Sequence, residues 1–237
     1  MKTLSRPLLL SLIFNIFLFT SVLYYVRKQG GIGFFKQKFG STAAVSDPYY
    51  QVRTSLFTLL PSNKNEEILF IGDSLTDYCD WYELMGNSNI RNRGIAGDFI
   101  EGVSRRLDEA LKSKPKKIFL MIGINNLVLI HNSKEQVLEA YEKLMKSIKA
   151  KSPSSLVYIE SILPVNGSLQ DNNLNIVSIN RGLVALTKKY NFQYINLHDS
   201  FLDKNNVLNS NYSADGLHLN GKGYLVWKEQ INDIVNE

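Results

Sequence analysis

The chain has 237 residues, 44% of them hydrophobic, a formal net charge of +5 and a single cysteine. Six of the 27 basic residues lie within residues 1–40, which contain no acidic residue, so 21 basic residues remain against 22 acidic ones. The main part of the chain therefore lacks the cationic excess that nucleic-acid binding requires. The lone Cys79 excludes an intramolecular disulfide and a cysteine-rich metal site, and its acidic neighbours indicate a packing role for the thiol.

An apolar segment over residues 8–26 is the first predicted element. About 19 helical residues rise roughly 28 Å, which is close to the thickness of the bilayer hydrocarbon. Two tyrosines followed by Arg27 and Lys28 are typical of a membrane interface. A cleaved signal peptide is the alternative, but its apolar core is usually shorter and a small-x-small cleavage site should follow directly. We therefore predict a transmembrane anchor over residues 1–28.

The orientation of this anchor rests on two opposing observations. Slightly more basic residues follow the span than precede it, which by charge counting alone favours a cytoplasmic location for the rest of the chain. A short N-terminal tail followed by one span is, however, the layout of a signal anchor, so we expect the folded domain on the extracytoplasmic side of the cell membrane. Residues 29–64 should form a juxtamembrane linker, with a short helix over residues 47–60.

From residue 65 to residue 237, apolar runs alternate with amphipathic stretches, which predicts one α/β domain with a mostly parallel sheet. Five strands are expected, over residues 67–72, 89–92, 117–122, 156–161 and 192–197. The predicted helices cover residues 75–85, 98–112, 134–150, 173–190 and 222–236. The third strand is apolar without alternation after its first residue, as expected for a strand covered on both faces. Function should lie on the loops that follow the strands.

The first strand runs into Gly72-Asp73-Ser74-Leu75. The glycine allows a tight turn, and Asp or Ser can cap the helix that follows. A serine hydroxyl at the carboxyl end of a central strand also lies where open α/β sheets bind ligands. These residues alone leave two interpretations of Ser74 open, a helix cap and a nucleophile.

Two further loops could bring hydrogen-bond donors to the same edge of the sheet. Residues 92–98 read Asn-Arg-Gly-Ile-Ala-Gly-Asp, and their glycines let a backbone N–H approach a ligand closely. Asn125 follows the third strand, where its side chain can donate to an oxyanion or act as an ordinary turn residue.

The candidate general bases are histidines. Asp215 and His218 are three residues apart in a glycine-containing turn, so the carboxylate can accept from Nδ1–H and leave Nε2 as a base. His198, which precedes Asp199 at the end of a predicted strand, is the second candidate. We expect His131 to be structural or to lie at the surface.

Taken together, the four loops resemble those of the SGNH/GDSL hydrolase family, in its platelet-activating-factor-acetylhydrolase-like and sialate-O-acetylesterase-like branches. The family is defined by four short conserved sequence blocks, and the four loops match them in the family's order. The resemblance covers roughly residues 66–236. It implies a three-layer α/β/α flavodoxin-like sandwich with a central, mostly parallel five-stranded sheet. It also implies a catalytic triad of Ser74, Asp215 and His218. The implied oxyanion hole is formed by Ser74, Gly94 and Asn125.

One position departs from the family pattern. The third block is usually Gly-x-Asn-Asp, whereas Asn126 follows Asn125 here. We expect this change to affect the rigidity of the loop more than the chemistry.

The resemblance implies ester hydrolysis through an acyl-enzyme, without a metal or cofactor. The predicted anchor and the lack of a long apolar insertion extend this to a membrane-anchored serine esterase that cleaves short-chain, preferably acetyl, esters on carbohydrate or cell-envelope substrates. A lysophospholipase-like or thioesterase-like lipid acylhydrolase and an O-acyltransferase are alternatives. A membrane-tethered binding module that has lost catalysis is an alternative of another class.

Overall fold

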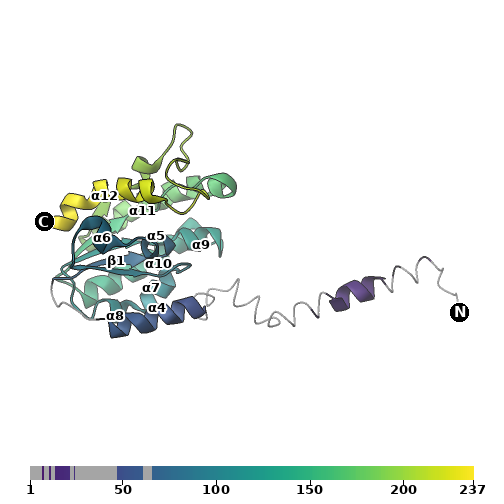
Figure 1. Ribbon diagram of the computed structural model, residues 1–237, viewed down its shortest axis with the longest axis horizontal. Coiled ribbons are helices and arrows are strands. Elements are labelled where there is room, and N and C mark those ends of the chain that lie inside the picture. The colour runs from purple at the N-terminus through teal and green to yellow at the C-terminus, as the bar shows by residue number, and fades with distance from the viewer. Residues whose placement is uncertain (1–6, 8–10, 12–13, 22–23, 25–46, 61–65) are drawn as a thin grey trace. The chain divides into compact units, whose positions relative to one another are not determined.

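The computed structural model describes residues 7, 11, 14–21, 24, 47–60 and 66–237 (Figure 1). The chain divides into two compact units, Met1–Ser46 and Asp47–Glu237. Among the described parts, none forms a helix with the length and apolar character that a membrane crossing requires. The predicted anchor over residues 1–28 lies mostly outside the described residues and stays a prediction.

The larger unit is built on a five-stranded parallel sheet with strand order β2-β1-β3-β4-β5. This is the flavodoxin-like order, in which the order of the strands reverses at the switch point between β1 and β3. Each predicted strand is confirmed to within two residues at either end. The observed strands are β1 Ile68–Gly72, β2 Ile90–Gly94, β3 Lys117–Met121, β4 Leu156–Glu160 and β5 Gln193–Ile195.

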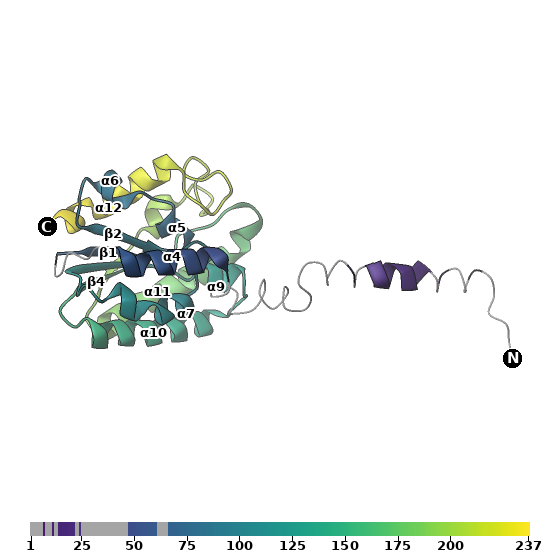
Figure 2. The ribbon, with the colours of Figure 1, turned by 60° about the horizontal axis from the view of Figure 1, so that its bottom comes forward.

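Helices cover both faces of this sheet (Figure 2). One face packs against α7 (Ile100–Arg105), α8 (Leu107–Ala110), α10 (Lys134–Lys151) and α11 (Asn173–Tyr190). The other packs against α5 (Ser74–Asp77), α6 (Trp81–Met85) and α12 (Gly221–Asn236). Successive strand side chains point to opposite faces, so Leu69 and Ile71 join the first core whereas Ile68 and Phe70 join the second. The three-layer sandwich is therefore confirmed.

Three short helical segments complete the described fold. The α-helix α9 (Ile124–Val128) follows β3 directly and was not predicted. The segments η1 (Gly167–Asn172) and η2 (His198–Phe201) are 3₁₀ helices, which follow β4 and β5 respectively. All three therefore lie on the carboxyl side of the sheet, where the candidate site was expected.

The helix predicted over residues 75–85 is two helices, α5 and α6. The side-chain amide of Asn92 on β2 donates to the carbonyl oxygens of Thr76, Asp77 and Cys79, at 2.9, 3.2 and 3.0 Å. These carbonyls would otherwise accept from the next helical turn, so the amide ends α5 and satisfies the freed groups. The helix predicted over residues 98–112 is likewise divided, between α7 and α8 at Arg106.

The predicted boundary between linker and domain needs a correction. The helix expected over residues 47–60 exists as α4 (Pro48–Leu59), but it belongs to the compact unit that begins at Asp47. Its Tyr50 and Phe57 side chains are buried against the rest of this unit. Apolar burial thus makes α4 part of the domain, which starts near residue 47 instead of residue 65.

A buried carboxyl group lies between β4 and the C-terminal helix. Glu160, the last residue of β4, is 1% exposed, and its Oε1 accepts from the Trp227 indole N–H at 2.8 Å. Burial raises the pKa of Glu160 to about 8, although the Trp227 hydrogen bond acts in the opposite direction.

This carboxyl group should make the stability of the protein fall as pH rises from about 4.5 to about 8. The unfolded chain releases the proton near pH 4.5, whereas the folded protein keeps it until about pH 8. Its contribution is therefore fully present below the unfolded pKa and is lost as pH rises through the folded pKa. Glu160→Gln keeps an acceptor for Trp227 without titrating, so urea unfolding should become less pH-dependent in this range. An unchanged pH dependence in Glu160→Gln would contradict the assignment.

Candidate active site

Ser74 is the first residue of α5, directly after the turn that ends β1. The cap of this helix is Asp73, whose Oδ1 accepts from the backbone N–H of Leu75 at 3.1 Å. The Ser74 hydroxyl is therefore not needed for capping. The backbone N–H of Ser74 belongs to the first helical turn and has no partner among the described residues. Asp73 is thus the helix cap, and the adjacent Ser74 remains the candidate nucleophile.

The turn near the C-terminus brings a histidine to this serine. Nε2 of His218 lies 3.1 Å from Oγ of Ser74, and Nδ1 of His218 lies 2.6 Å from Oδ2 of Asp215. The other Asp215 oxygen accepts from the backbone N–H groups of Leu217 and His218, at 2.9 and 2.8 Å. Residues 144 positions apart in the sequence therefore form one line of hydrogen-bonding groups.

Hydrogen bonds and charge fix the protonation state of Asp215 in this line. Burial acts to raise the pKa of Asp215, but the hydrogen bonds from the His218 ring and from the two backbone N–H groups outweigh it and hold the pKa below the usual range. The ionised carboxylate accepts the Nδ1 proton of His218, which leaves Nε2 as the acceptor for the Ser74 hydroxyl. This is the arrangement that general-base activation of a serine requires.

The other two histidines lie elsewhere. His198 is buried in η2, where Nδ1 lies 3.1 Å from Oδ1 of Asp199 and its backbone N–H donates to Ser161. It makes no hydrogen bond to Ser74 within the described structure. His131 is exposed, in agreement with its expected place at the surface. The structure therefore pairs Ser74 with His218 and leaves the second candidate base in a different environment.

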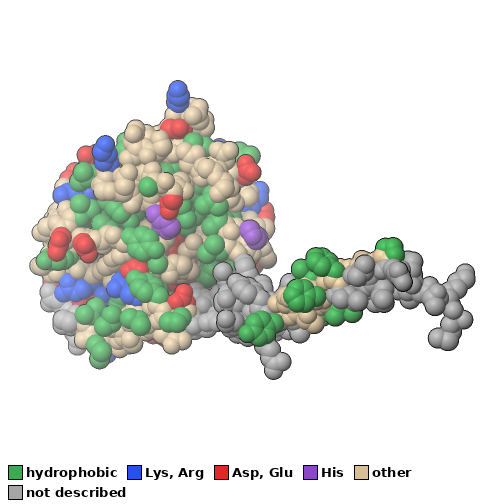
Figure 3. Space-filling model, turned by 45° about the vertical axis from the view of Figure 1, so that its right-hand side comes forward, with side chains coloured by type: hydrophobic (Ala, Val, Ile, Leu, Met, Phe, Trp, Pro, Cys, Tyr) green, Lys and Arg blue, Asp and Glu red, His purple; other side chains and the backbone are tan. Residues whose placement is uncertain are grey.

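Two members of the triad reach solvent, whereas Ser74 is only 5% exposed. The side chains of His218 and Asp215 are 32% and 54% exposed. One face of the molecule carries a surface histidine beside an acidic side chain and among hydrophobic side chains (Figure 3). Tyr78 is also exposed, and its ring centre lies 5.3 Å from that of His218. The His218 and Asp215 end of the triad is thus open to solvent, whereas Ser74 is largely buried behind it.

Asn125, the second residue of α9, reaches the same edge of the sheet from β3. One hydrogen of its side-chain amide is donated to the carbonyl oxygen of Asp98, at 2.9 Å. The side chain is otherwise buried and makes no second hydrogen bond within the described structure, so one N–H remains for a ligand.

The expectation for Gly94 needs a correction. Its backbone N–H donates to Oδ1 of Asn92 at 2.8 Å and is not free to donate to a substrate. A Cβ on Gly94 would lie 2.3 Å from the backbone nitrogen of Asp77, so the glycine is needed for the close approach of β2 to α5.

Gly97 is the better candidate donor in this loop. Its φ is +76°, and its backbone N–H has no partner among the described residues. It precedes Asp98, whose carbonyl oxygen holds the Asn125 side chain. In the sequence, Gly97 is visible as the second glycine of the segment 92–98. That its N–H is free and the N–H of Gly94 is not can be seen only from the hydrogen bonds of the folded chain.

A buried ion pair, not predicted from the sequence, joins these loops. Nε of Arg106 lies 2.9 Å from Oδ2 of Asp98, and the two side chains are 4% and 0% exposed. The same guanidinium donates to the carbonyl oxygens of Arg93 and Gly72, at 2.6 and 3.1 Å. One side chain thus connects the ends of β1 and β2 to the loop that carries Gly97.

The departure at Asn126 has a structural explanation. This fully buried side chain accepts from the backbone N–H of Ile100 at 3.1 Å, which caps α7. Its amide donates to Oε2 of Glu101 and to Oδ1 of Asn132, at 3.0 and 3.2 Å. An aspartate could accept from Ile100, but it would place a second carboxylate against Glu101. The amide therefore matches its neighbours in this chain.

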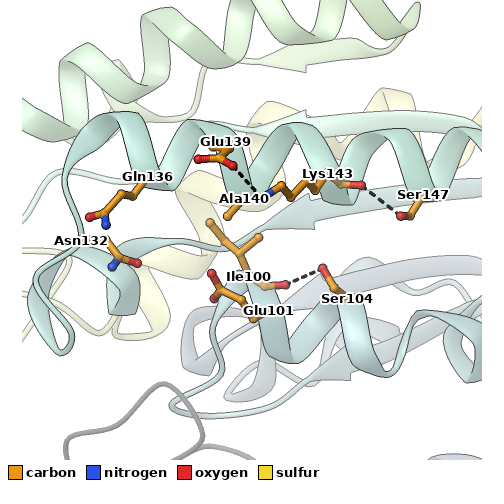
Figure 4. Close-up of a pocket in the computed structure, with 9 residues that line it drawn as sticks. All are labelled: Ile100, Glu101, Ser104, Asn132, Gln136, Glu139, Ala140, Lys143 and Ser147. Atoms are coloured by element: carbon orange, nitrogen blue, oxygen red, sulfur yellow. Dashed lines mark hydrogen bonds and ion pairs between the residues drawn. The ribbon is translucent and has the colours of Figure 1, made fainter.

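Glu101 and Asn132 also line a groove between α7 and α10 with a volume of about 420 Å³ (Figure 4). None of the triad residues lines this groove. Asn126 therefore supports the loops behind the candidate site. The groove is separate from Ser74.

Asn126→Asp should destabilise the protein, because its carboxylate would face Glu101. We expect a loss of about 1–3 kcal/mol, as for a buried polar group deprived of its partner. Adding Glu101→Gln should recover most of this loss, because glutamine can donate to the new carboxylate. Urea unfolding of the two single variants and the double variant measures the coupling. If Asn126→Asp alone were as stable as the wild type, this account of the substitution would fail.

Comparisons with known proteins agree with this geometry. The model of the GDSL-like Lipase/Acylhydrolase family matches residues 70–226. The N-acylneuraminate cytidylyltransferase of Escherichia coli O18:K1:H7 is 31% identical over 174 residues, which make up 71% of this chain but only 40% of that relative. Platelet-activating factor acetylhydrolase IB subunit alpha2 of Rattus norvegicus is 26% identical over 196 residues, covering 80% of this chain and 84% of the relative.

A solved structure supports the same assignment. It is of a protein from Streptococcus pneumonia described as a platelet activating factor, with 29% identity and a TM-score of 0.72. The match covers 79% of this chain and 92% of that one. The family model alone covers well over half of the sequence. The chain therefore belongs to the GDSL-like lipase/acylhydrolase family of carboxylic ester hydrolases.

Proposed function

We propose that this protein is a serine esterase that hydrolyses short-chain esters through an acyl-enzyme. The observation that carries the proposal is the line of groups from Ser74 Oγ through His218 to Asp215, with separations of 3.1 and 2.6 Å. Membership of a family of ester hydrolases supports the reaction class.

In the first half of the reaction, Ser74 Oγ attacks the ester carbonyl carbon while its proton passes to Nε2 of His218. Asp215 orients the ring and stabilises the imidazolium. The resulting oxyanion accepts hydrogen bonds from the backbone N–H groups of Ser74 and Gly97 and from the free amide hydrogen of Asn125. Loss of one such donor typically costs about 2.7–4 kcal/mol of transition-state stabilisation.

The second half returns the enzyme to its starting state. His218 gives its proton to the leaving alcohol, and the acyl group remains on Ser74 Oγ. Water then enters, His218 removes a proton from it, and the hydroxide attacks the acyl carbon. Collapse of the second oxyanion releases the carboxylic acid, and the proton on His218 returns to Ser74.

For the substrate, we propose an acetyl or similarly short acyl group on a carbohydrate or another cell-envelope molecule. The exposed His218 and Asp215 side chains support a small acyl group attached to a large alcohol, because the alcohol can extend into solvent. The sequence from residue 65 onwards has no long apolar insertion of the kind that covers a lipase site. One relative carries acetylhydrolase in its name, which is consistent with a short acyl group.

Substitution of the triad should separate the two candidate bases. We expect Ser74→Ala and His218→Ala each to lower kcat for p-nitrophenyl acetate by about three orders of magnitude or more. His198→Ala is the matched control and should stay within a few-fold of wild type, because His198 is paired with Asp199 away from Ser74. The reverse pattern for the two histidines would reassign the base.

A fluorophosphonate probe provides the control for these kinetics. The probe should label folded wild-type protein and leave Ser74→Ala unlabelled, since it reacts only with an activated serine. Absence of labelling in folded wild type would overturn the nucleophile assignment and favour the binding-module alternative.

We also propose that residues 1–28 anchor the enzyme in the cell membrane as a single span, with the catalytic domain on the extracytoplasmic side. The apolar run over residues 8–26 and the interfacial tyrosines and basic residues after it support this arrangement. The full chain should stay with membranes after alkaline carbonate washing, whereas a chain lacking residues 1–28 should not. Protease added to spheroplasts should degrade the domain; protection of the domain would place it in the cytoplasm.

A further inference from the structure

Helix α4 (Figure 2) lies outside residues 70–226, the part of the chain that matches the family model. Its Tyr49 and Arg53 nevertheless contact Asp77 of α5, the helix that begins at Ser74. We propose that α4 positions the oxyanion loop, defined as residues 94–98, relative to the nucleophile. Tyr49 and Arg53 are the positioning residues. Both act through Asp77, and Arg53 also acts through the carbonyl oxygen of Gly94. This inference rests on the proposed esterase function and adds residues that the family comparison does not include.

Asp77 is the junction between these parts. It is the last residue of α5, whose first residue is Ser74, and its side chain is only 3% exposed. Its Oδ2 accepts from the backbone N–H of Ala96 in the oxyanion loop at 2.9 Å and from the hydroxyl of Tyr49 at 2.6 Å. One carboxylate therefore links the nucleophile helix, the loop and α4.

Arg53 strengthens the same junction from a second direction. Its Nη2 lies 2.8 Å from Oδ1 of Asp77 and also donates to the carbonyl oxygen of Gly94 at 3.3 Å. Its guanidinium carbon lies 4.9 Å from the ring centre of the buried Phe57, one turn further along α4. The arginine therefore supplies the positive charge for a buried carboxylate and holds the start of the oxyanion loop.

The tyrosine keeps its role as a donor throughout the pH range of an esterase assay. Burial, followed by the hydrogen bond to Asp77, raises the pKa of Tyr49 to about 12. The phenol therefore stays protonated and donates to the carboxylate. Tyr50, the next residue, donates to the carbonyl oxygen of Gly102 at 3.1 Å and fixes α4 against α7.

The consequence for catalysis follows from the order of residues in the loop. Asp77 holds the N–H of Ala96, and the next N–H along the chain is that of Gly97, the candidate oxyanion donor. The far end of the loop is held by Asn125 through the carbonyl oxygen of Asp98. Without α4, Asp77 would lose two partners and the near end of the loop would be held less firmly. Misplaced oxyanion donors weaken the transition state more than the bound ester.

The test uses full-length protein with Tyr49→Phe, Arg53→Met, Arg53→Lys and the double variant Tyr49→Phe/Arg53→Met. Gln51→Ala is the matched control, because Gln51 is exposed on the same helix and its side chain makes no contact with the site. Active sites are counted by fluorophosphonate titration, and kcat and KM are measured with p-nitrophenyl acetate.

We expect Arg53→Met to lower kcat per titrated site by about tenfold or more, with KM within about twofold of wild type, because the affected interaction forms in the transition state. Tyr49→Phe should have a smaller effect in the same direction, and the double variant the largest. Arg53→Lys should recover part of kcat, because an ammonium can still pair with Asp77 but lacks the planar fork of arginine.

Two results would overturn the inference while leaving the esterase function intact. One is an unchanged kcat per titrated site in Arg53→Met with only a lower Tm, which would make α4 purely a stabilising element. The other is a raised KM at unchanged kcat, which would place α4 in substrate binding. If Arg53→Met does not fold, Tyr49→Phe is judged by the same criteria. If wild type and Gln51→Ala both fail to hydrolyse esters, the proposed function itself fails, and the inference fails with it.

Discussion

The buried ion pair between Arg106 and Asp98 is the interaction on which the site depends. The guanidinium also binds the carbonyl oxygens of Gly72 and Arg93, and the carbonyl of Asp98 in turn holds Asn125. Removing one partner from a buried pair leaves an uncompensated charge and typically costs about 3–5 kcal/mol. The ends of β1 and β2 and the third loop therefore cannot rearrange one at a time. This constraint fixes the positions of the candidate oxyanion donors.

The carboxyl groups around Ser74 differ in the partners that surround them. Asp98 and Asp77 are paired with Arg106 and Arg53, and Asp215 is held ionised beside His218. Asp73 differs, because burial raises its pKa to about 7 and its Oδ2 has no hydrogen-bond partner in the described structure. The carboxylate that faces the His218 imidazole is thus the partly exposed one, which forms its hydrogen bonds without the full cost of burial.

Contacts around the candidate site extend beyond the segment that matches the family model. Helix α4 adds a tyrosine, an arginine and a buried phenylalanine to the back of the oxyanion loop, and its inclusion moves the start of the domain to Asp47. At Asn126, the chain replaces a family aspartate with an amide that suits its neighbour Glu101. In both places, the side chains around the candidate site are matched to one another.

Local patterns in the sequence were sufficient for much of this description. Buried apolar runs predicted five parallel strands, and the turn residues after them predicted where functional groups lie. The pairing of Asp215 with His218 was predictable because it forms within one turn of four residues. Tertiary structure decided the features that depend on distant contacts. Asn92 occupies the Gly94 amide and divides a predicted helix. Arg106 joins the ends of β1 and β2 to the loop that carries Gly97, and packing of Phe57 brings α4 into the domain. These outcomes depend on which donors and acceptors pair after folding. Periodicity along the chain carries no information about pairs that are distant in the sequence.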